Sequence, residues 1–347
     1  MTTEFARLAA FGWSNHFQAQ LSTVETLAAT PVRVLAVHRN GLDVAAPDLG
    51  PMRVAPLVAE RDEGAATVGD WLLISPKSHR PLRVLERRSL FKRRAAGTDA
   101  RVQLIAANVD TLLIVTSCNQ DFNVARLERY LALAREAGVT PVVVLTKADL
   151  AEDTGPYVAA ASKLMPGLLV ECLDARSGEA ATTLGVWCAS GQTVALVGSS
   201  GVGKSTLVNT LTGIAEQATA PIREDDAHGR HTTTGRSMHR LAAGGWLLDT
   251  PGMRELQLAD AAEGIAEVFA DIVALSSGCR FADCTHESEP GCAVQAAIAD
   301  GSLEPERLAR YRKLGREEAW NSEAIYERRA RDRKFGRMHR AIKDKRA

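Results

Sequence analysis

The chain has 347 residues, of which 46% are hydrophobic and 24% charged, and its 42 basic residues balance its 42 acidic ones. This composition is typical of a soluble globular protein with two or three domains, and it excludes a uniformly polybasic chain. The first residues lack the pattern of a signal peptide, and no apolar run reaches the roughly 18 residues that span a bilayer, so we expect a cytoplasmic protein. Residues 327–347 hold ten Lys or Arg against three acids, a local balance of about +7 that would confine any affinity for polyanions to such segments.

The N-terminal part is expected to contain a leader and a small β domain. Residues 1–30 have the pattern of a loosely helical leader. From 31 to 100, short β-branched runs alternate with Gly and Pro, as in Val32–Val37, Leu42–Ala45 and Trp71–Ile74. Several short strands at this spacing predict a small barrel or sandwich, and we favour an OB-like β-barrel.

A central α/β domain is expected over residues 101–265. The apolar run Thr111–Thr116 is followed by an amphipathic segment, Val124–Ala137, and by a second apolar run, Val139–Leu145. Such alternation predicts a parallel sheet flanked by helices. After about residue 265 the strand pattern stops, and we expect residues 266–347 to form a helical zinc-binding domain with a basic tail. Further predicted strands are Leu168–Leu173, Thr193–Val197 and Trp246–Leu248.

A phosphate-binding loop is predicted at Gly198–Ser205, whose sequence fits G-x-x-x-x-G-K-[ST]. The loop follows the predicted strand Thr193–Val197 and precedes the predicted helix Lys204–Leu211. Backbone N–H groups and the helix N-terminus would hold the phosphates, while Lys204 would reach the terminal phosphates and Ser205 would bind Mg²⁺. The alternative is a Gly-rich turn that binds nothing. The predicted phosphate-binding residues are Gly198, Ser199, Ser200, Gly201, Val202, Gly203, Lys204, Ser205 and Thr206.

Two later segments are expected to complete the phosphate and metal site. Asp249 ends an apolar run and opens Asp-Thr-Pro-Gly, so its carboxylate would hold Mg²⁺ and the Gly252 N–H would meet the terminal phosphate. The polar segment Gly229–Gly235 contains three threonines, of which Thr233 is our first choice as a Mg²⁺ ligand. The alternatives are an ordinary turn at 249–252 and a solvated loop at 229–235.

A guanine-binding motif is predicted at Thr146-Lys147-Ala148-Asp149, directly after an apolar run. The Asp149 carboxylate would accept the N1–H and 2-amino hydrogens of guanine, which adenine does not offer. A second loop containing Asp174 and Ala175 would contact the guanine O6. The alternative for Thr146–Asp149 is a surface Lys/Asp pair. Its place at the carboxyl end of a strand favours a ligand site, because that edge of an α/β sheet binds ligands.

A metal site is predicted where three cysteines gather around one histidine. Cys279, Cys284, His286 and Cys292 lie within fourteen residues and supply the ligand set of a closed tetrahedral Zn²⁺ site. Because no position is left for water, we expect a structural role. The alternative is a group of cysteines that are merely buried.

The order of these elements is informative, since the base-binding loops near 146 and 174 precede the phosphate loop. In a Ras-like chain the base loops come last. A GTPase domain permuted in this way, with a small β-barrel before it and a Cys/His cluster after it, resembles the family of ribosome small subunit-dependent GTPase A (RsgA, or YjeQ). The resemblance covers about residues 31–295 and includes Val68–Trp71, Glu86–Arg88, Ala106–Asp110 and Gly229–Thr234. Thr146 departs from the family pattern, where Asn is commoner.

The resemblance implies a GTP hydrolase that binds the small ribosomal subunit and its rRNA during late subunit maturation. It further implies one Zn²⁺, Mg²⁺ with the nucleotide, and stimulation of hydrolysis by the subunit; we expect a monomer. After Gly252 the chain has Met253, which cannot orient a nucleophilic water as a Gln does in Ras-like proteins. Slow intrinsic hydrolysis is therefore expected, and His231, with Thr233, is our candidate catalytic group.

Two other functions fit part of the sequence. A P-loop ATPase or small-molecule kinase would share Lys204, Ser205 and Asp249 but would not need Asp149. An RNA-binding assembly factor with a vestigial nucleotide site would keep the fold without the reaction. Nucleotide competition distinguishes the ATPase or kinase from a GTPase, and single-turnover hydrolysis distinguishes the RNA-binding factor from a GTPase.

Overall fold

The structure is a computed structural model, and it describes residues 2–57, 64–94, 102–213, 236–249, 253, 258 and 260–322. One eleven-stranded sheet has the order β10-β9-β8-β11-β13-β12-β1-β2-β3, and β4 and β5 branch from β1. Strands β8, β9, β10, β11 and β13 are parallel, and β12 is antiparallel to β13. Their bounds are β8 Thr111–Ser117, β9 Thr140–Thr146, β10 Leu169–Cys172, β11 Thr193–Val197, β12 Arg236–Arg240 and β13 Trp246–Asp249.

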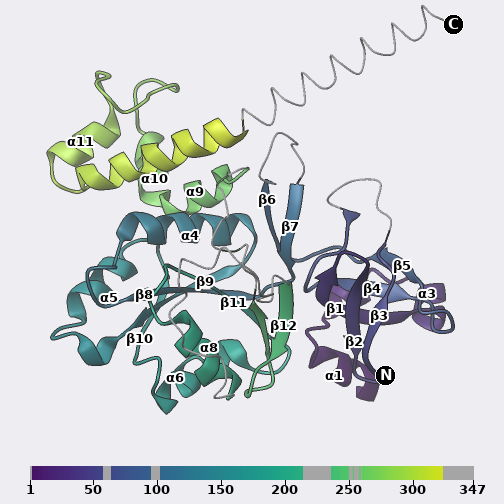
Figure 1. Cartoon of the computed structure of the whole chain (residues 1–347). Helices are drawn as coiled ribbons and strands as arrows, with labels where there is room; N and C mark the ends of the chain where they lie inside the picture. The colour runs from purple at the N-terminus through teal and green to yellow at the C-terminus, as the bar shows by residue number, and fades with distance from the viewer. Residues whose placement is uncertain are drawn as a thin grey trace, which may run out of the picture.

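Helices cover both faces of the parallel strands, as Figure 1 shows. Every residue of β8 is buried, which is what a strand with helices on both faces requires. On one face, Leu112 and Ile114 pack in the core that contains Leu131 of α4; on the other, Leu113 packs in the core that contains Leu207 of α8. The predicted α/β alternation is therefore confirmed. The helices are α4 Val124–Glu136, α5 Gly155–Ser162, α6 Gly178–Thr183, α7 Gly185–Cys188 and α8 Lys204–Thr212.

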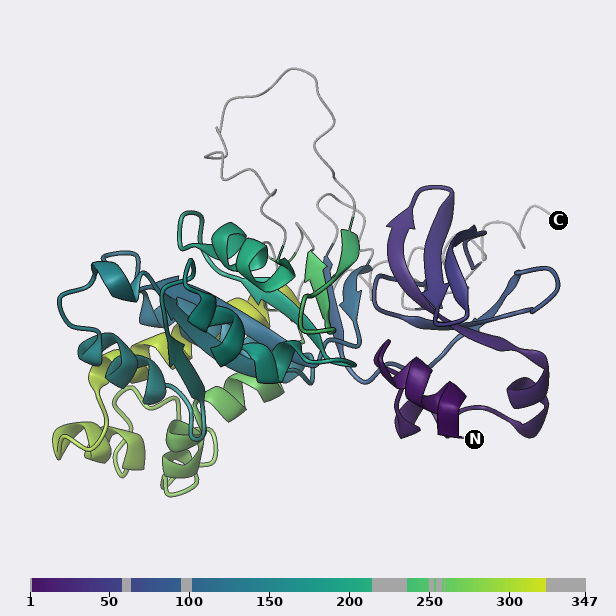
Figure 2. The same ribbon diagram turned by 90° about the horizontal axis from the view of Figure 1, so that it is seen from below.

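The N-terminal strands join the same sheet. Strand β1 pairs with β4 along its first half and with β2 along its second half, and Ala36 and Val37 pair with Ser237 and Arg236 of β12. Strands β3 and β5 do not pair in the part of the chain that the structure describes, so closure into an OB-like barrel is not confirmed. Figure 2 shows these strands beside the layered α/β half. Their bounds are β1 Thr30–His38, β2 Gly41–Ala46, β3 Leu49–Val54, β4 Trp71–Ile74 and β5 Pro81–Val84.

The first thirty residues contain three short helices, α1 Thr2–Ala9, α2 Asn15–Gln18 and α3 Thr23–Ala28. Residues of α1 and α2 and of the segment between them pack against the β strands, whereas α3 buries no side chain and is joined to β5 by the Glu25–Arg83 ion pair. Trp13 lies edge-on to Trp71 with ring centroids 4.8 Å apart, and Phe17 is 1% exposed in the same cluster.

Strands β6 Leu90–Arg94 and β7 Val102–Ala107 form a separate two-stranded sheet. The C-terminal part is helical, with α9 Ala262–Val268, α10 Ala270–Ser276, α11 Ala293–Ala299 and a helix that begins at residue 305. Helix α9 lies against α4 so closely that a Cβ on Gly264 would be 2.2 Å from the Ala132 oxygen. Buried Glu128 of α4 accepts hydrogen bonds from Arg307 and Arg310. Among the described residues, no helix has the length and apolar character needed to span a membrane.

Candidate nucleotide site and metal cluster

The segment predicted as a phosphate loop connects β11 to α8, as its sequence requires. Strand β11 ends at Val197, and α8 begins at Lys204. Gly198 has φ +143°, and a Cβ there would lie 2.1 Å from the Val115 oxygen of the neighbouring strand. Only glycine fits this close approach without moving β8. Val202 is fully buried and Ser205 is exposed in the first turn of α8.

Two cationic side chains meet at Ser199 in this loop. Lys204 Nζ donates a hydrogen bond to the Ser199 carbonyl oxygen, and Arg126 Nη1, from the first turn of α4, donates to Ser199 Oγ. The helix N-terminus adds positive potential from the backbone N–H groups of α8. The loop is therefore surrounded by groups that favour an anion.

The predicted base loop lies at the end of β9 and is bonded to the phosphate loop. Thr146 is buried, and its Oγ1 lies 2.6 Å from the Val202 oxygen and 3.0 Å from the Thr116 oxygen. The hydroxyl at this position thus links the two loops, although Thr lacks the amide of the commoner Asn. Lys147 adopts a left-handed conformation with φ 59° and precedes the short 3₁₀ helix Ala148–Leu150, which contains Asp149.

Arg176 connects the two base loops. Its Nη2 donates to Asp149 Oδ2 at 2.6 Å and its Nε to Asp174 Oδ1 at 3.3 Å. The backbone N–H of Arg176 and then its side chain hold the pKa of Asp174 below its usual range. Ala175 accepts a hydrogen bond from Thr210 Oγ1 of α8 at 2.7 Å. The predicted residues of both base loops are therefore gathered at the carboxyl edge of the sheet, beside the phosphate loop.

The other predicted switch residues are only partly described. Asp249 ends β13, which runs parallel to β11 with Leu248 opposite Ala195, so its backbone lies near the start of the phosphate loop; its side chain is outside the described part. His231, Thr233 and Gly252 also lie outside the described residues. Met253 is 1% exposed and packs in the core, so it does not present a side chain to water.

The predicted zinc ligands are brought together. The ligand atoms of Cys279, Cys284, His286 and Cys292 all lie within 4.8 Å of one another. His286 Nδ1 is 3.5 Å from the sulfurs of Cys279 and Cys292, which are 3.9 Å apart. Tetrahedral zinc, with Zn–S of about 2.3 Å and Zn–N of about 2.1 Å, would separate two sulfurs by about 3.8 Å and sulfur from nitrogen by about 3.6 Å. The distances among Cys279, His286 and Cys292 therefore match those of a tetrahedral zinc site, and Cys284 completes the set of four ligands within 4.8 Å.

The surroundings of His286 set which nitrogen faces the sulfurs. Ser276 Oγ donates to the Ile272 oxygen at 2.7 Å, so it must accept from His286 Nε2–H, 3.0 Å away. Nδ1 is then unprotonated and able to bind a metal. Burial lowers the pKa of His286, which favours the neutral imidazole that a metal requires. Gln295 Nε2 donates to the His286 carbonyl oxygen and fixes the backbone at this left-handed residue.

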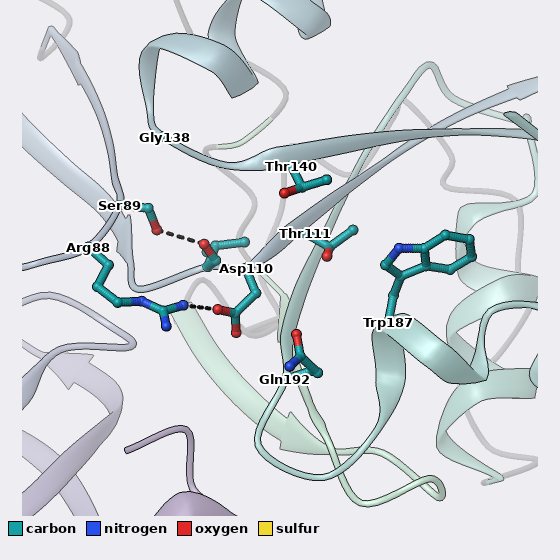
Figure 3. Close-up of a pocket in the computed structure, with 9 residues that line it drawn as sticks. Arg88, Ser89, Asp110, Thr111, Gly138, Thr140, Trp187 and Gln192 are labelled. Carbon is teal, nitrogen blue, oxygen red and sulfur yellow. Dashed lines mark hydrogen bonds and ion pairs between the residues drawn. The ribbon is translucent and has the colours of Figure 1, made fainter. Parts of the chain in front are cut away.

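A hollow of about 460 Å³ lies at the opposite edge of the sheet, near the amino ends of β8 and β9. Figure 3 shows Arg88 paired with Asp110 on one side of it and Trp187 on the other. Ligands of open α/β sheets bind at the carboxyl ends of the strands. This hollow is therefore separate from the candidate nucleotide site.

Sequence reasoning did not find Arg126 or Arg176. Arg176 directly follows the predicted residues Asp174 and Ala175, so a basic residue two positions after Asp174 was the available signal. Arg126 is 73 positions before Ser199, and nothing in its local sequence indicates that contact. Only the packing of α4 against β8 and β9 brings the two together.

Comparison with known proteins gives consistent matches. A sequence model described as RsgA GTPase matches residues 84–259. The chain is 52% identical to the small ribosomal subunit biogenesis GTPase RsgA of Mesorhizobium japonicum, covering 93% of each chain. It is 50% identical to small ribosomal subunit biogenesis GTPase RsgA 2 of Vibrio parahaemolyticus, covering 95% of this chain and 91% of the relative.

Two solved structures share the fold. YjeQ from Thermotoga maritima has a TM-score of 0.60 at 23% identity and covers 82% of this chain and 97% of its own. YloQ, described as a circularly permuted GTPase, has a TM-score of 0.57 at 22% identity and covers 87% of this chain and 96% of its own. The chain therefore belongs to the RsgA GTPase family and is a GTP hydrolase with a circularly permuted GTPase fold.

Proposed function

We propose that this chain binds the small ribosomal subunit and its rRNA during late subunit maturation, and that the subunit stimulates its hydrolysis of GTP. The proposal that the chain binds GTP rests on one observation: the base loops lie against the phosphate loop, to which the Thr146–Val202 hydrogen bond joins them. The names of the relatives, which are small ribosomal subunit biogenesis GTPases, support the subunit as partner. We further propose that the protein acts as a cytoplasmic monomer.

The proposed nucleotide site follows from the positions of its residues. Asp149 and Asp174 lie at the base end, where the Asp149 carboxylate would accept the N1–H and 2-amino hydrogens of guanine. Lys204 reaches the end of the loop where the terminal phosphates would lie. The proposed GTP-binding residues are Thr146, Lys147, Asp149, Asp174, Ala175, Gly198, Ser199, Ser200, Gly201, Val202, Gly203, Lys204, Ser205, Thr206, Asp249 and Gly252.

Magnesium would be held by Ser205, Thr233 and Asp249. The Ser205 hydroxyl is exposed at the first turn of α8, a position that suits a metal bound beside the phosphates. When bound, Mg²⁺ supplies positive charge to the phosphate oxygens. Because Met253 is buried, we assign the orientation of the attacking water to His231, with Thr233 as the other residue of the switch loop.

Zinc is proposed to be structural. Four protein ligands complete a tetrahedron, so no position remains for a substrate. Cys292 is the N-cap of α11. One Zn²⁺ held by Cys279, Cys284, His286 and Cys292 would join segments that have few apolar residues of their own.

We propose four parts for the chain: a leader over 1–30, an OB-like barrel over 31–100, the permuted GTPase domain over 101–265 and the zinc-binding domain over 266–347. The two-sided pairing of β1 with β2 and β4 supports a partly open barrel of five strands. An OB-like face would offer one rRNA surface and the basic tail another.

Single-turnover hydrolysis of GTP with and without small subunits tests the proposal. The wild type should release phosphate slowly alone and at least about tenfold faster with subunits. Lys204→Ala should lose hydrolysis in both conditions, and Asp149→Asn should lose GTP affinity while gaining affinity for xanthosine triphosphate. The absence of any acceleration by subunits would refute the proposed partner, and unchanged GTP preference in Asp149→Asn would refute the proposed base site.

A further inference from the structure

Two positive side chains at one residue of the phosphate loop need an explanation. Lys204 Nζ contacts the carbonyl oxygen of Ser199, and Arg126 contacts its hydroxyl. Arg126 thus brings a second positive charge to the residue that the Lys204 ammonium already contacts. The lysine is part of the phosphate-binding motif, whereas nothing in the motif requires the arginine.

Arg126 also stands at an unfavourable place on its own helix. Asn123 caps α4, with its side chain accepting from the Arg126 backbone N–H at 2.9 Å, so Arg126 lies in the first helical turn. The N-terminus of a helix is its positive end, and a cation there is disfavoured. Among the described residues Arg126 has no carboxylate partner. An anion at the phosphate loop would offset this unfavourable position.

The position of Arg126 along the loop identifies which part of the nucleotide it faces. At the far end of the loop, Val202 bonds to Thr146, and Gly203 lies against Thr146 and Ala175, so that end faces the base. Ser199 lies at the opposite end, and the side chain of Lys204 extends back to its carbonyl oxygen. Since the lysine of this motif reaches the terminal phosphates, Arg126 approaches the nucleotide from the terminal-phosphate side.

We propose that Arg126 is a positioning residue for GTP hydrolysis, which fixes Ser199 and places a second positive charge beside the terminal phosphate. This inference rests on the nucleotide site proposed above. Negative charge on the transferred phosphoryl group is spread over its oxygens in the transition state, and an arginine in the same chain can stabilise it. The contribution matters here because Met253 is buried and does not orient water.

The rest of α4 holds this residue in place. Glu128, two positions along, is fully buried and bonded to Arg310 at 2.7 Å and Arg307 at 3.2 Å. The helix is thereby fixed to the C-terminal helices, and Arg126 extends from its first turn to the loop. A guanidinium presented from a fixed helix keeps its orientation during the reaction.

The test compares four variants of the full-length protein in the absence of ribosomal subunits. Arg126→Ala removes both charge and hydrogen bond, Arg126→Lys keeps the charge, and Arg126→Gln keeps a neutral donor. Arg135→Ala is the matched control, because Arg135 lies in the last turn of the same helix and pairs with Glu267, away from the loop. Single-turnover GTP hydrolysis, GTP and GDP affinity, and binding of GDP with aluminium fluoride are measured.

Arg126→Ala should slow single-turnover hydrolysis by about tenfold to hundredfold and weaken binding of GDP with aluminium fluoride. Its GDP affinity should stay within about twofold of wild type, because GDP lacks the terminal phosphate. Arg126→Lys should recover part of the rate. Arg126→Gln should be as slow as Arg126→Ala, and the control Arg135→Ala should behave like wild type.

Three results would overturn the inference: an unchanged rate in Arg126→Ala, equal losses of GTP and GDP affinity, or full recovery in Arg126→Gln. The results would be different if the proposed nucleotide site itself were wrong. In that case the wild type itself would not bind guanine nucleotides, and Lys204→Ala would behave like wild type.

Discussion

Removing the Ser276 hydroxyl tests how the zinc cluster is held. Ser276 is the acceptor for His286 Nε2–H, at 3.0 Å, and its own proton goes to the Ile272 oxygen. In Ser276→Ala the imidazole loses the group that fixes its tautomer and ring orientation. Nδ1 is then protonated in part of the population, and a protonated nitrogen cannot bind zinc.

The expected loss is about tenfold to hundredfold in zinc affinity, the range for removing a partner of a metal-bound histidine. This corresponds to about 1.4 to 2.8 kcal/mol. A structural zinc site binds with about 10 to 16 kcal/mol, so the variant should still fold and hold zinc when zinc is abundant. The difference must therefore be measured by competition rather than by zinc content.

The assay is titration with a chromophoric zinc chelator, in which the variant should release zinc at a lower chelator concentration. Ser277→Ala is the control, since Ser277 Oγ donates to the Ala274 oxygen at 2.7 Å in the same helical end and does not contact His286. Equal zinc affinities in Ser276→Ala and Ser277→Ala would refute the role given to Ser276.

Three further predictions concern the loops and the N-terminal part. Thr146→Val removes a buried hydroxyl that bonds to the phosphate loop, and should weaken GDP and GTP binding equally, by about 1 to 3 kcal/mol in nucleotide titrations. Gly198→Ala should abolish nucleotide binding and lower the melting temperature, because its Cβ would lie 2.1 Å from the Val115 oxygen. The pKa of Glu25 is lowered from 4.5 to about 2, first by Arg83, so its stabilising effect is present above pH 4.5 and lost as the pH falls towards 2. The melting temperatures of wild type and Glu25→Gln should therefore differ at pH 7 and converge near pH 2.

Much of the central fold was predictable because the parallel strands are buried on both faces. The run Thr193–Val197 is apolar after its first residue, and Gly198 ends it, so the bounds of β11 were predicted to the residue. The helix predicted at Val124–Ala137 differs by one residue from α4. When a long periodic segment is bounded by glycine or a capping residue, its sequence marks where the element begins and ends.

The association of distant segments was not predictable. The pairing of β1 with β12 joins Val37 to Arg236, and no pattern in either strand specifies the other as neighbour. Phe17 lies in the short helix α2 and Trp13 lies just before it, and the burial of both depends on Trp71. Local periodicity reports which face is apolar but not what will cover it.

The candidate site divides in the same way. The phosphate loop, base motif and zinc ligands could be predicted because each is a short motif whose chemistry fixes its spacing, and the structure gathers the described members. Arg126 and Arg176 act through the fold instead. Arginine is long and common on surfaces, so its role depends on which acid or loop the packing brings within reach.

Because of the strand order, the circular permutation connects the switch segments to the parts of the chain on both sides of the GTPase domain. Strand β12 begins at Arg236, directly after the threonine loop in sequence, and its pairing with Val37 ties that end of the loop to the N-terminal strands. Strand β13 ends at Asp249, and the chain then continues to Met253 and to α9, which packs on α4. The phosphate loop itself touches α4 through Arg126, and α4 is bonded to the C-terminal helices through Glu128. A change at the terminal phosphate would thus reach the N-terminal strands through β12 and the zinc-binding part through α4, with no need for a long connecting segment. In this arrangement the two parts that flank the GTPase domain would respond to cleavage of the same bond, as the proposed binding and release of the small subunit would require.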